Sequence, residues 1–306
     1  LQQMLFGQNV LNIGTVEEGG IVQVALHGAQ AADRLRPRKR PPALPRPVPE
    51  FVDREQEQKV VGQSLALGQL VGVHGADGAG KTALVKQTMH TQLPTSFPDG
   101  RIYLSARHEA REDLFQELVE SFYETGDGHV KLTENRARRF LDNKQALIAI
   151  DDANYLKDEE VKALAEVVPR CAILITSRKQ LVWQRSSVEL RGLPRDEAVR
   201  LFEQNWGPVS QQDRPAVEAI CHAVDDMPDL VIKAALIAAK RNVPPGEMAG
   251  WLQADRQASG AGDRAVRAIG SRLSEGDRRM LGALASLGTA SMDLQALQDI
   301  TGLPRV

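Results

Sequence analysis

The chain has little cysteine and almost no excess charge of either sign. Its 306 residues include two cysteines, Cys171 and Cys221, which lie far apart in apolar segments. This pattern offers neither a disulfide framework nor a cysteine metal knuckle, and it fits a reducing, cytoplasmic location. The formal net charge of -2 gives no global attraction to nucleic acid or to an anionic membrane.

Long hydrophobic runs and internal repeats are also absent. A membrane span needs about 20 consecutive apolar residues, and the longest candidate, residues 230–239, is interrupted by Lys233. No repeat period and no cleavable signal is visible. Without a long apolar run, we expect the chain to have no membrane association. Because the sequence begins at Leu1 and stops at Val306 in the middle of a pattern, we expect it to be a piece of a longer protein.

The most informative stretch is a Gly-rich turn between a short apolar run and an amphipathic helix. It has the spacing Gly-x4-Gly-Lys-Thr and contains three glycines, Gly75, Gly78 and Gly80. Glycine lets the backbone bend around an anion, so that its N–H groups and the helix dipole point at phosphates. Lys81 is then expected to reach the β and γ phosphates, and the Thr82 hydroxyl to ligate Mg²⁺. The alternative is a chance Gly-rich turn, but the strand before and the helix after favour nucleotide binding.

Two further apolar strands end in polar residues. Residues 146–150 are followed by Asp151 and Asp152, and a second apolar strand that begins at Cys171 ends in Ser177 and Arg178. With short strands expected at 101–104 and 187–190 and helices between them, the pattern predicts an α/β fold, a parallel sheet with helices on both faces. Ligands bind beyond the carboxyl ends of such strands. We therefore expect the Gly-rich turn and both polar tips at one edge of the sheet.

These polar tips have candidate roles in phosphate chemistry. Asp151 is suited to hold Mg²⁺ through water, and Asp152 to orient or deprotonate an attacking water. Arg178 is placed to detect a γ phosphate through charge-assisted hydrogen bonds. The alternatives are a helix cap or solvated loop acids for the aspartates, and an ordinary surface residue for the arginine. His74 is expected to be a packing residue.

The chain divides into five segments by composition and periodicity. In order they are an N-terminal β-hairpin segment (1–33), a Pro/Arg-rich linker (34–49), a P-loop nucleotide-binding domain (50–207), a small helical domain (208–270) and the truncated start of a winged-helix domain (271–306).

The first two segments carry specific expectations. Alternating residues at 9–16 and 21–26 predict the two strands of the hairpin. The Pro/Arg-rich segment is expected to be extended and largely solvated. Its basic run from Arg36 to Arg40 leaves open a contact with nucleic acid or acidic lipid, although a solvated linker is favoured.

The order of the motifs resembles the nucleotide-binding core of STAND ATPases of the NB-ARC type. Residues 51–55 resemble the motif that precedes the phosphate cradle in that family, Gly75 to Thr82 matches Walker A, and Leu147 to Asp152 matches Walker B. Residues 173–178 are close to the sensor strand, and residues 226–230 occupy the place of the Gly-Leu-Pro-Leu motif. In two places the chain departs from the family pattern, with Asp53 for a glycine, and Asp226 and Asp229 for small or apolar residues.

The resemblance implies a nucleotide site for ATP or ADP with Mg²⁺. Phe51 and Val52 would border the adenine, Arg54 would face the nucleotide, and Pro228 would contact the adenine from the helical domain. The phosphate loop would consist of Gly75, Gly78, Ala79, Gly80, Lys81, Thr82 and Ala83. Thr82 and Asp151 would hold the metal, and the catalytic set would be Lys81, Asp151, Asp152 and Arg178.

The resemblance also implies a switch in bacterial signalling or defence. An ADP-bound closed monomer would exchange to an ATP-bound oligomer, and weak ATP hydrolysis would reset it, with effector and sensor partners that the sequence does not identify. One alternative is a transcriptional regulator of the same superfamily that contacts DNA. A second is a motor or loader ATPase of the wider AAA+ kind.

Overall fold

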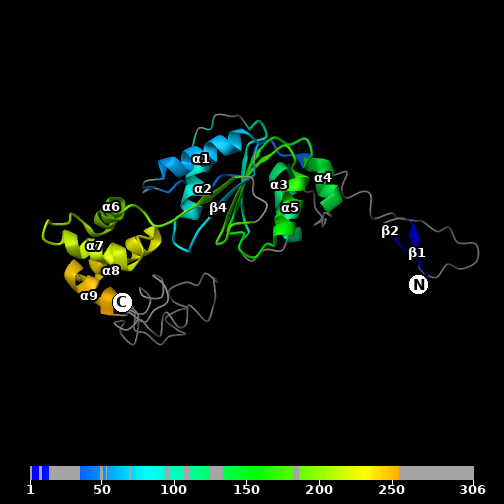
Figure 1. Cartoon of the computed structure of the whole chain (residues 1–306). Helices are drawn as coiled ribbons and strands as arrows, with labels where there is room; N and C mark the ends of the chain where they lie inside the picture. The colour runs from blue at the N-terminus through cyan, green and yellow to red at the C-terminus, as the bar shows by residue number, and fades with distance from the viewer. Residues whose placement is uncertain are drawn as a thin grey trace, which may run out of the picture. The chain divides into compact units, whose positions relative to one another are not determined.

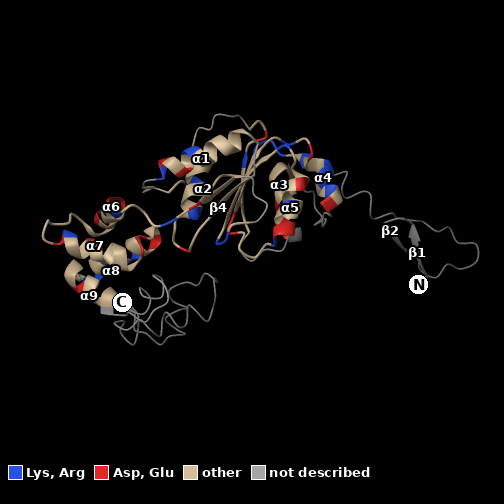
Figure 2. Ribbon diagram, viewed as in Figure 1, with Lys and Arg blue, Asp and Glu red and all other residues tan. Residues whose placement is uncertain are grey.

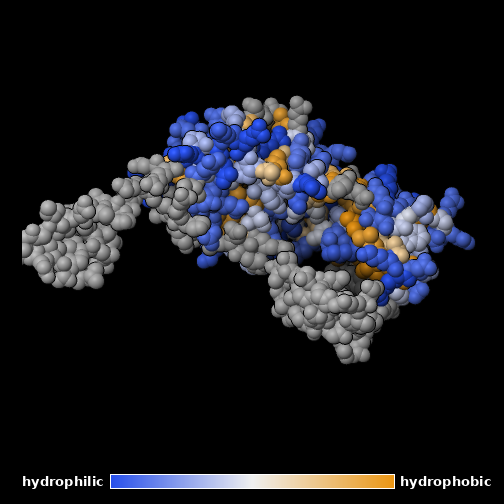
Figure 3. All heavy atoms as spheres, turned by 180° about the vertical axis from the view of Figure 1, so that it is seen from behind, coloured by the Kyte–Doolittle hydropathy of each residue, from blue (hydrophilic) through white to orange (hydrophobic). Residues whose placement is uncertain are grey.

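The protein is described from a computed structural model, which divides into two compact units (Figure 1). The first unit comprises Leu1–Ala76 and Lys81–Leu190, and the second Asp77–Gly80 and Arg191–Val306. The structure describes residues 2–6, 9–13, 35–48, 51–52, 54–68, 70–91, 93, 97–106, 111–124, 134–181 and 186–254. Within these residues no helix combines the length and apolar character needed to cross a bilayer. Figure 3 shows hydrophilic residues over most of the described surface in that view, with hydrophobic residues in smaller areas.

The core of the first unit is a five-stranded sheet in the order β5-β7-β8-β4-β9. The strands are β4 (Leu70–His74), β5 (Arg101–Ser105), β7 (Leu147–Asp151), β8 (Ala172–Ser177) and β9 (Ser186–Glu189). Every neighbouring pair is parallel. β7 and β8 are buried at every position, as expected for central strands covered on both faces. The predicted parallel α/β sheet is confirmed.

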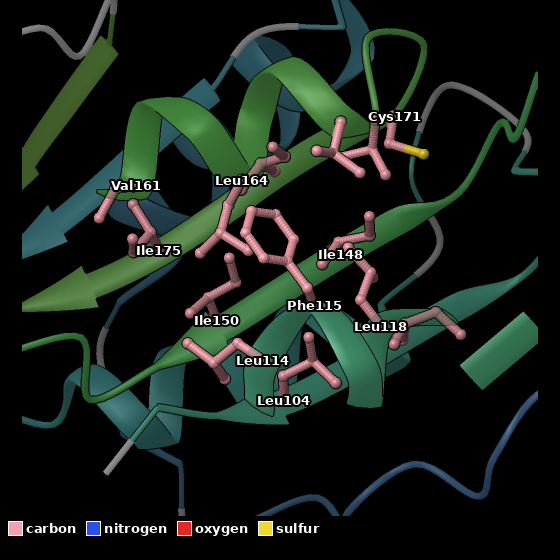
Figure 4. Close-up of a cluster of buried hydrophobic side chains, with 14 of the residues drawn as sticks. Leu104, Leu114, Phe115, Leu118, Ile148, Ile150, Val161, Leu164, Cys171 and Ile175 are labelled. Carbon is pink, nitrogen blue, oxygen red and sulfur yellow. The ribbon is translucent and has the colours of Figure 1, made fainter. Parts of the chain in front are cut away.

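Helices cover both faces of this sheet, as predicted (Figure 1). They are α1 (Glu55–Ala66), α2 (Lys81–His90), α3 (Arg111–Phe122), α4 (Glu134–Leu141) and α5 (Asp158–Val167). On one face α3 packs Leu114, Phe115 and Leu118 against Ile148 and Ile150 of β7 in a single apolar cluster (Figure 4). α1 and α2 contact the sheet from the other side, along β4, β7 and β8.

The described N-terminal hairpin pairs a predicted strand with one that was not predicted. β1 (Gln2–Phe6) pairs antiparallel with β2 (Asn9–Ile13), and the register Phe6↔Asn9 leaves two residues between the strands. Two-residue connections are the commonest in hairpins. Residues 9–13 form a strand, as predicted, and their pairing with β1 was not foreseen. The expected pairing with 21–26 stays a prediction, because residues 14–34 lie outside the described residues.

The Pro/Arg-rich segment is mostly exposed, as expected, but it is not a free linker. β3 (Arg36–Pro37) pairs antiparallel with β6 (Tyr123–Glu124). Arg38 donates hydrogen bonds from its backbone and its guanidinium to carbonyl groups at the C-terminal end of α3. Farther along, a ring nitrogen of His90 hydrogen-bonds the carbonyl oxygen of Pro45 at 2.7 Å. These bonds attach the segment to the first unit at several points.

The second unit is a small helical bundle. It contains α6 (Arg195–Trp206), α7 (Arg214–Ala223), α8 (Pro228–Arg241) and α9 (Pro245–Ala254). Because α6 packs on α7 and α8, the division falls after Leu190, earlier in the chain than the expected boundary at residue 207. The end of the expected helical domain, from residue 255, and the expected start of a winged-helix domain at 271–306 lie outside the described residues.

Candidate nucleotide-binding site

The Gly-rich turn follows β4 and ends where α2 begins at Lys81. All three of its predicted glycines have positive φ, +151° at Gly75, +83° at Gly78 and +93° at Gly80. A Cβ atom at Gly75 would lie only 2.3 Å from the carbonyl oxygen of Leu190, so this position accepts no side chain. The loop thus brings bare backbone to a helix N-terminus, where unpaired N–H groups and the helix dipole favour an anion.

The Lys81 side chain folds back over this loop. Its Nζ atom donates hydrogen bonds to the carbonyl oxygens of Gly75 at 2.8 Å and Ala76 at 2.9 Å. Thr82 is exposed at the first turn of α2, while Ala79 in the loop is fully buried. The ammonium group therefore lies beside the same backbone that is proposed to surround the phosphates.

The three polar strand ends lie at one edge of the sheet. β8 lies between β4 and β7 in the strand order, and the parallel registers pair His74 with Ser177 and Ser105 with Asp151. The Gly-rich turn, the aspartates and the sensor tip therefore emerge side by side, as parallel strands require. His74 has a partner within the sheet, since its Nδ1 atom is 3.0 Å from the Ser187 hydroxyl, which agrees with a packing role.

Asp151 is held at both carboxylate oxygens by hydroxyl groups from the two flanking strands. It is 4% exposed. Thr176 of β8 donates a hydrogen bond to Oδ1 at 2.6 Å, and Tyr103 of β5 donates one to Oδ2 at 2.8 Å. Burial and the nearby charges of Asp151 and Asp152 raise the pKa of the Tyr103 hydroxyl, so it remains a donor at neutral pH. Sequence reasoning assigned no role to Tyr103 or Thr176.

Asp152 has an unusual backbone and a shared partner. Its φ of +62° is left-handed, which costs about 1 kcal/mol for a residue other than glycine. Its N–H donates to the Thr176 hydroxyl at 2.8 Å, and its carboxylate accepts a hydrogen bond from Asn154. The amide oxygen of Asn154 also accepts the backbone N–H of Arg178 at 2.6 Å. Asn154, which the sequence did not single out, thus links the second aspartate to the exposed Arg178.

The oxygen donors at this edge fit a small hard cation. Mg²⁺ prefers oxygen ligands and usually takes one or two from protein while phosphates supply others. The carboxylate of Asp151 and the hydroxyl of Thr82 are oxygen donors of that kind. In the described part of the chain no group of three or more His, Cys, Asp and Glu side chains is arranged to hold a metal.

The residues expected at the adenine lie in both units. In the first, Phe51 and Val52 are half-buried, and the 7% exposed Arg54 precedes α1 and pairs with Glu57 at 2.8 Å. In the second, Pro228 is the first residue of α8.

The tip of the Gly-rich turn, residues 77–80, is grouped with the second unit. Within that unit the Asp229 N–H donates to the Gly78 carbonyl at 3.2 Å. A Cβ atom on Gly80 would lie 3.9 Å from Cγ of Pro228. The start of α8 therefore packs directly on the tip of the loop.

The fold and this sheet edge together define a P-loop nucleotide-binding protein of the α/β class. The NB-ARC domain family matches residues 54–212, just over half of the chain. The chain therefore belongs to the NB-ARC family, as the order of its motifs indicates.

Curated relatives come from mycobacteria. Two of them are Rv0890c of Mycobacterium tuberculosis and Mb0914c of Mycobacterium bovis, each provisionally named an HTH-type transcriptional regulator. Each is 26% identical to this chain over 203 residues, which cover 61% of the chain. The matched region covers 22% of each relative, so the chain spans about a fifth of their length.

One solved structure, with a TM-score above 0.5, supports the fold. The Walker-type ATPase PABY2304 of Pyrococcus abyssi is similar with a TM-score of 0.52 and 17% identity, over 85% of this chain and 91% of that one. The STAND protein PH0952 of Pyrococcus horikoshii, which has a tetratricopeptide repeat sensor, gives a TM-score of 0.48 and 16% identity, over 83% of this chain and 37% of that one.

Proposed function

We propose that the chain is the nucleotide-binding core of an ATP/ADP switch of the STAND type in bacterial signalling or defence. The observation that carries the proposal is the arrangement at one sheet edge of an NB-ARC domain, where a Gly-rich loop with Lys81 follows β4 and the buried carboxylate of Asp151 ends β7, with β8 between them. In this proposal the closed monomer holds ADP, exchange for ATP favours an oligomer, and slow hydrolysis resets the switch. The location would be cytoplasmic, consistent with two free, buried cysteines.

Each residue at the sheet edge has a role in this proposal. The N–H groups of the loop and the ammonium group of Lys81 would bind the β and γ phosphates. Thr82 and Asp151 would hold Mg²⁺, which supplies polarisation of a phosphoryl oxygen when it is bound. Asp152 would orient the attacking water, and Arg178 would contact the γ phosphate from the end of the next strand.

Switching requires that the nucleotide discriminate between two arrangements of the protein. A ligand shifts such an equilibrium only by its difference in affinity for the two states. A nearly complete shift, from 1:99 to 99:1, needs a ratio of affinities of about 10⁴. Because ADP and ATP differ by the γ phosphate, the groups proposed to contact it, Lys81 and Arg178, would have to supply that difference.

Two measurements on the purified protein test the proposal. Denaturation and chromatography of the released small molecules identify the bound nucleotide, and ADP is expected. Sedimentation then measures the oligomeric state. A monomer is expected with ADP, and an oligomer with a non-hydrolysable ATP analogue. Release of no nucleotide would contradict the proposal. High basal turnover in stable rings without a trigger would favour a motor or loader ATPase instead.

A second candidate is a transcriptional regulator built on the same nucleotide-binding core. It is supported by the provisional names of the mycobacterial relatives. DNA contact would be made by a winged-helix domain or by the basic residues from Arg36 to Arg40. DNA affinity that falls steeply with salt in the full-length protein would favour this candidate, and DNA affinity indistinguishable from zero at low salt would remove it.

A further inference from the structure

We propose that Tyr103 is a positioning residue for magnesium, which acts by fixing the carboxylate of Asp151. The inference rests on the proposed nucleotide function and adds a residue to its site. Tyr103 lies on β5, the edge strand next to β7, and neither the family motifs nor the polar strand tips include it.

The sheet register explains how Tyr103 reaches Asp151. Ser105 is paired with Asp151 and Tyr103 with Ala149, so Tyr103 is two residues back on the neighbouring strand and points to the same face as Asp151. Such diagonal neighbours lie about 7–8 Å apart at Cα, a distance that an aromatic side chain spans. The phenol ring therefore places its hydroxyl 2.8 Å from Oδ2 of Asp151.

The carboxylate is fixed from both sides. Thr176, on the strand at the other side of β7, donates to Oδ1, and Tyr103 donates to Oδ2. With one hydrogen bond on each oxygen, rotation of the carboxylate would break one of them. Each oxygen keeps a second lone pair for a metal-bound water. Because Asp151 is 4% exposed, bulk water has little access to replace the phenol hydroxyl.

Loss of the Tyr103 hydroxyl is expected to weaken magnesium binding and to leave the phosphate contacts unchanged. Groups that orient a metal ligand typically contribute about 10-fold to 100-fold in metal affinity. The phosphate contacts proposed for the loop and Lys81 do not involve β5. A purely structural role in joining β5 to β7 would instead reduce stability and nucleotide affinity regardless of the metal.

The test compares the unmodified chain with Tyr103→Phe and a matched control, Tyr123→Phe. Tyr123 also donates its hydroxyl within the first unit, to the carbonyl oxygen of Phe140 at 2.9 Å, but it does not bond Asp151. For each protein the affinity for a fluorescent ADP analogue is measured in Mg²⁺ and in EDTA. The ratio of the two affinities is the magnesium enhancement, and the midpoint of thermal unfolding is recorded beside it.

Tyr103→Phe is expected to reduce the magnesium enhancement about 10-fold, with an unchanged affinity in EDTA, while Tyr123→Phe keeps the full enhancement. In an Asp151→Asn background, Tyr103→Phe should have no further effect on the enhancement, since the residue acts through Asp151. An unchanged enhancement in Tyr103→Phe overturns this inference alone, as does an equal loss in Mg²⁺ and EDTA or a variant that does not fold. An unmodified chain that binds no ADP analogue overturns the proposed function as well.

Discussion

Replacement of Thr176 by valine removes one hydroxyl that serves both aspartates of the site. This hydroxyl, on a residue that is 1% exposed, donates to Asp151 at 2.6 Å and accepts the Asp152 N–H at 2.8 Å. A hydrogen bond to a charged group contributes about 1.5–3 kcal/mol, and a buried donor without a partner costs about 1–3 kcal/mol. These two contributions are not additive, because both hydrogen bonds share one hydroxyl and the site can relax. We therefore expect Thr176→Val to lower the free energy of unfolding by about 3 kcal/mol.

Urea unfolding followed by circular dichroism measures this change, and Thr88→Val provides the control. Thr88 is 2% exposed, and its hydroxyl donates only to the Leu84 carbonyl, one turn earlier in α2. Its loss should cost less than about 1 kcal/mol, because that carbonyl lies within the helix and no charge is involved. Thr176→Ser should keep most of the stability. Equal effects of the two valine variants would refute the reasoning that a shared, charge-assisted network is formed at Thr176.

Three further outcomes are expected. Gly75→Ala should reduce ADP-analogue affinity at least about tenfold in a binding titration, because its Cβ would lie 2.3 Å from the Leu190 carbonyl oxygen and the loop would have to move; unchanged affinity would contradict the loop geometry. Gly192→Ala should lower the free energy of unfolding by about 2–4 kcal/mol, because its Cβ would lie 2.2 Å from the Asp225 carbonyl oxygen, and the midpoint of thermal unfolding should fall with it. Burial raises the pKa of the Cys171 thiol from 9.0 to about 11; because the unfolded chain then loses its proton first, stability should fall by about 2 kcal/mol between pH 9 and pH 11, and a Cys171→Ala variant should lose that part of the slope.

The sequence predicts the sheet and the edge at which its polar strand tips meet well, because both follow from strongly local patterns. The buried strands β7 and β8 are nearly uninterrupted apolar runs, and the Gly-rich turn has a spacing that few other structures need. Parallel connectivity then requires that the polar tips share one edge. The order of the strands and the register between them had to come from the structure.

The groups that orient the aspartates could not be recognised from sequence. Tyr103 reads as one more aromatic residue in a half-buried strand, and Thr176 as the polar end of an apolar one. Their role depends on which strands flank β7 and on the register between them, which one sequence does not determine. The one available signal was the alternation of side chains along each strand, because Tyr103 and Thr176 lie on the same face of the sheet as Asp151.

The N-terminal segments were harder still. Gln2–Phe6 lacks the alternation that marks a half-buried strand, so its pairing with β2 was missed. The Pro/Arg-rich segment is attached through backbone groups and single side chains such as His90. Such bonds leave no periodic trace in the composition.

The most direct test of the central claim is the affinity of the Lys81→Ala variant for ADP. The chain offers Lys162→Ala as a control, since this lysine is exposed on α5 and, within the described residues, its ion pair is a long one with Glu166 at 3.9 Å. Titration with a fluorescent ADP analogue should show no measurable binding by Lys81→Ala and normal binding by Lys162→Ala. An affinity of Lys81→Ala close to that of the unmodified chain would contradict the assignment of this loop as the phosphate site.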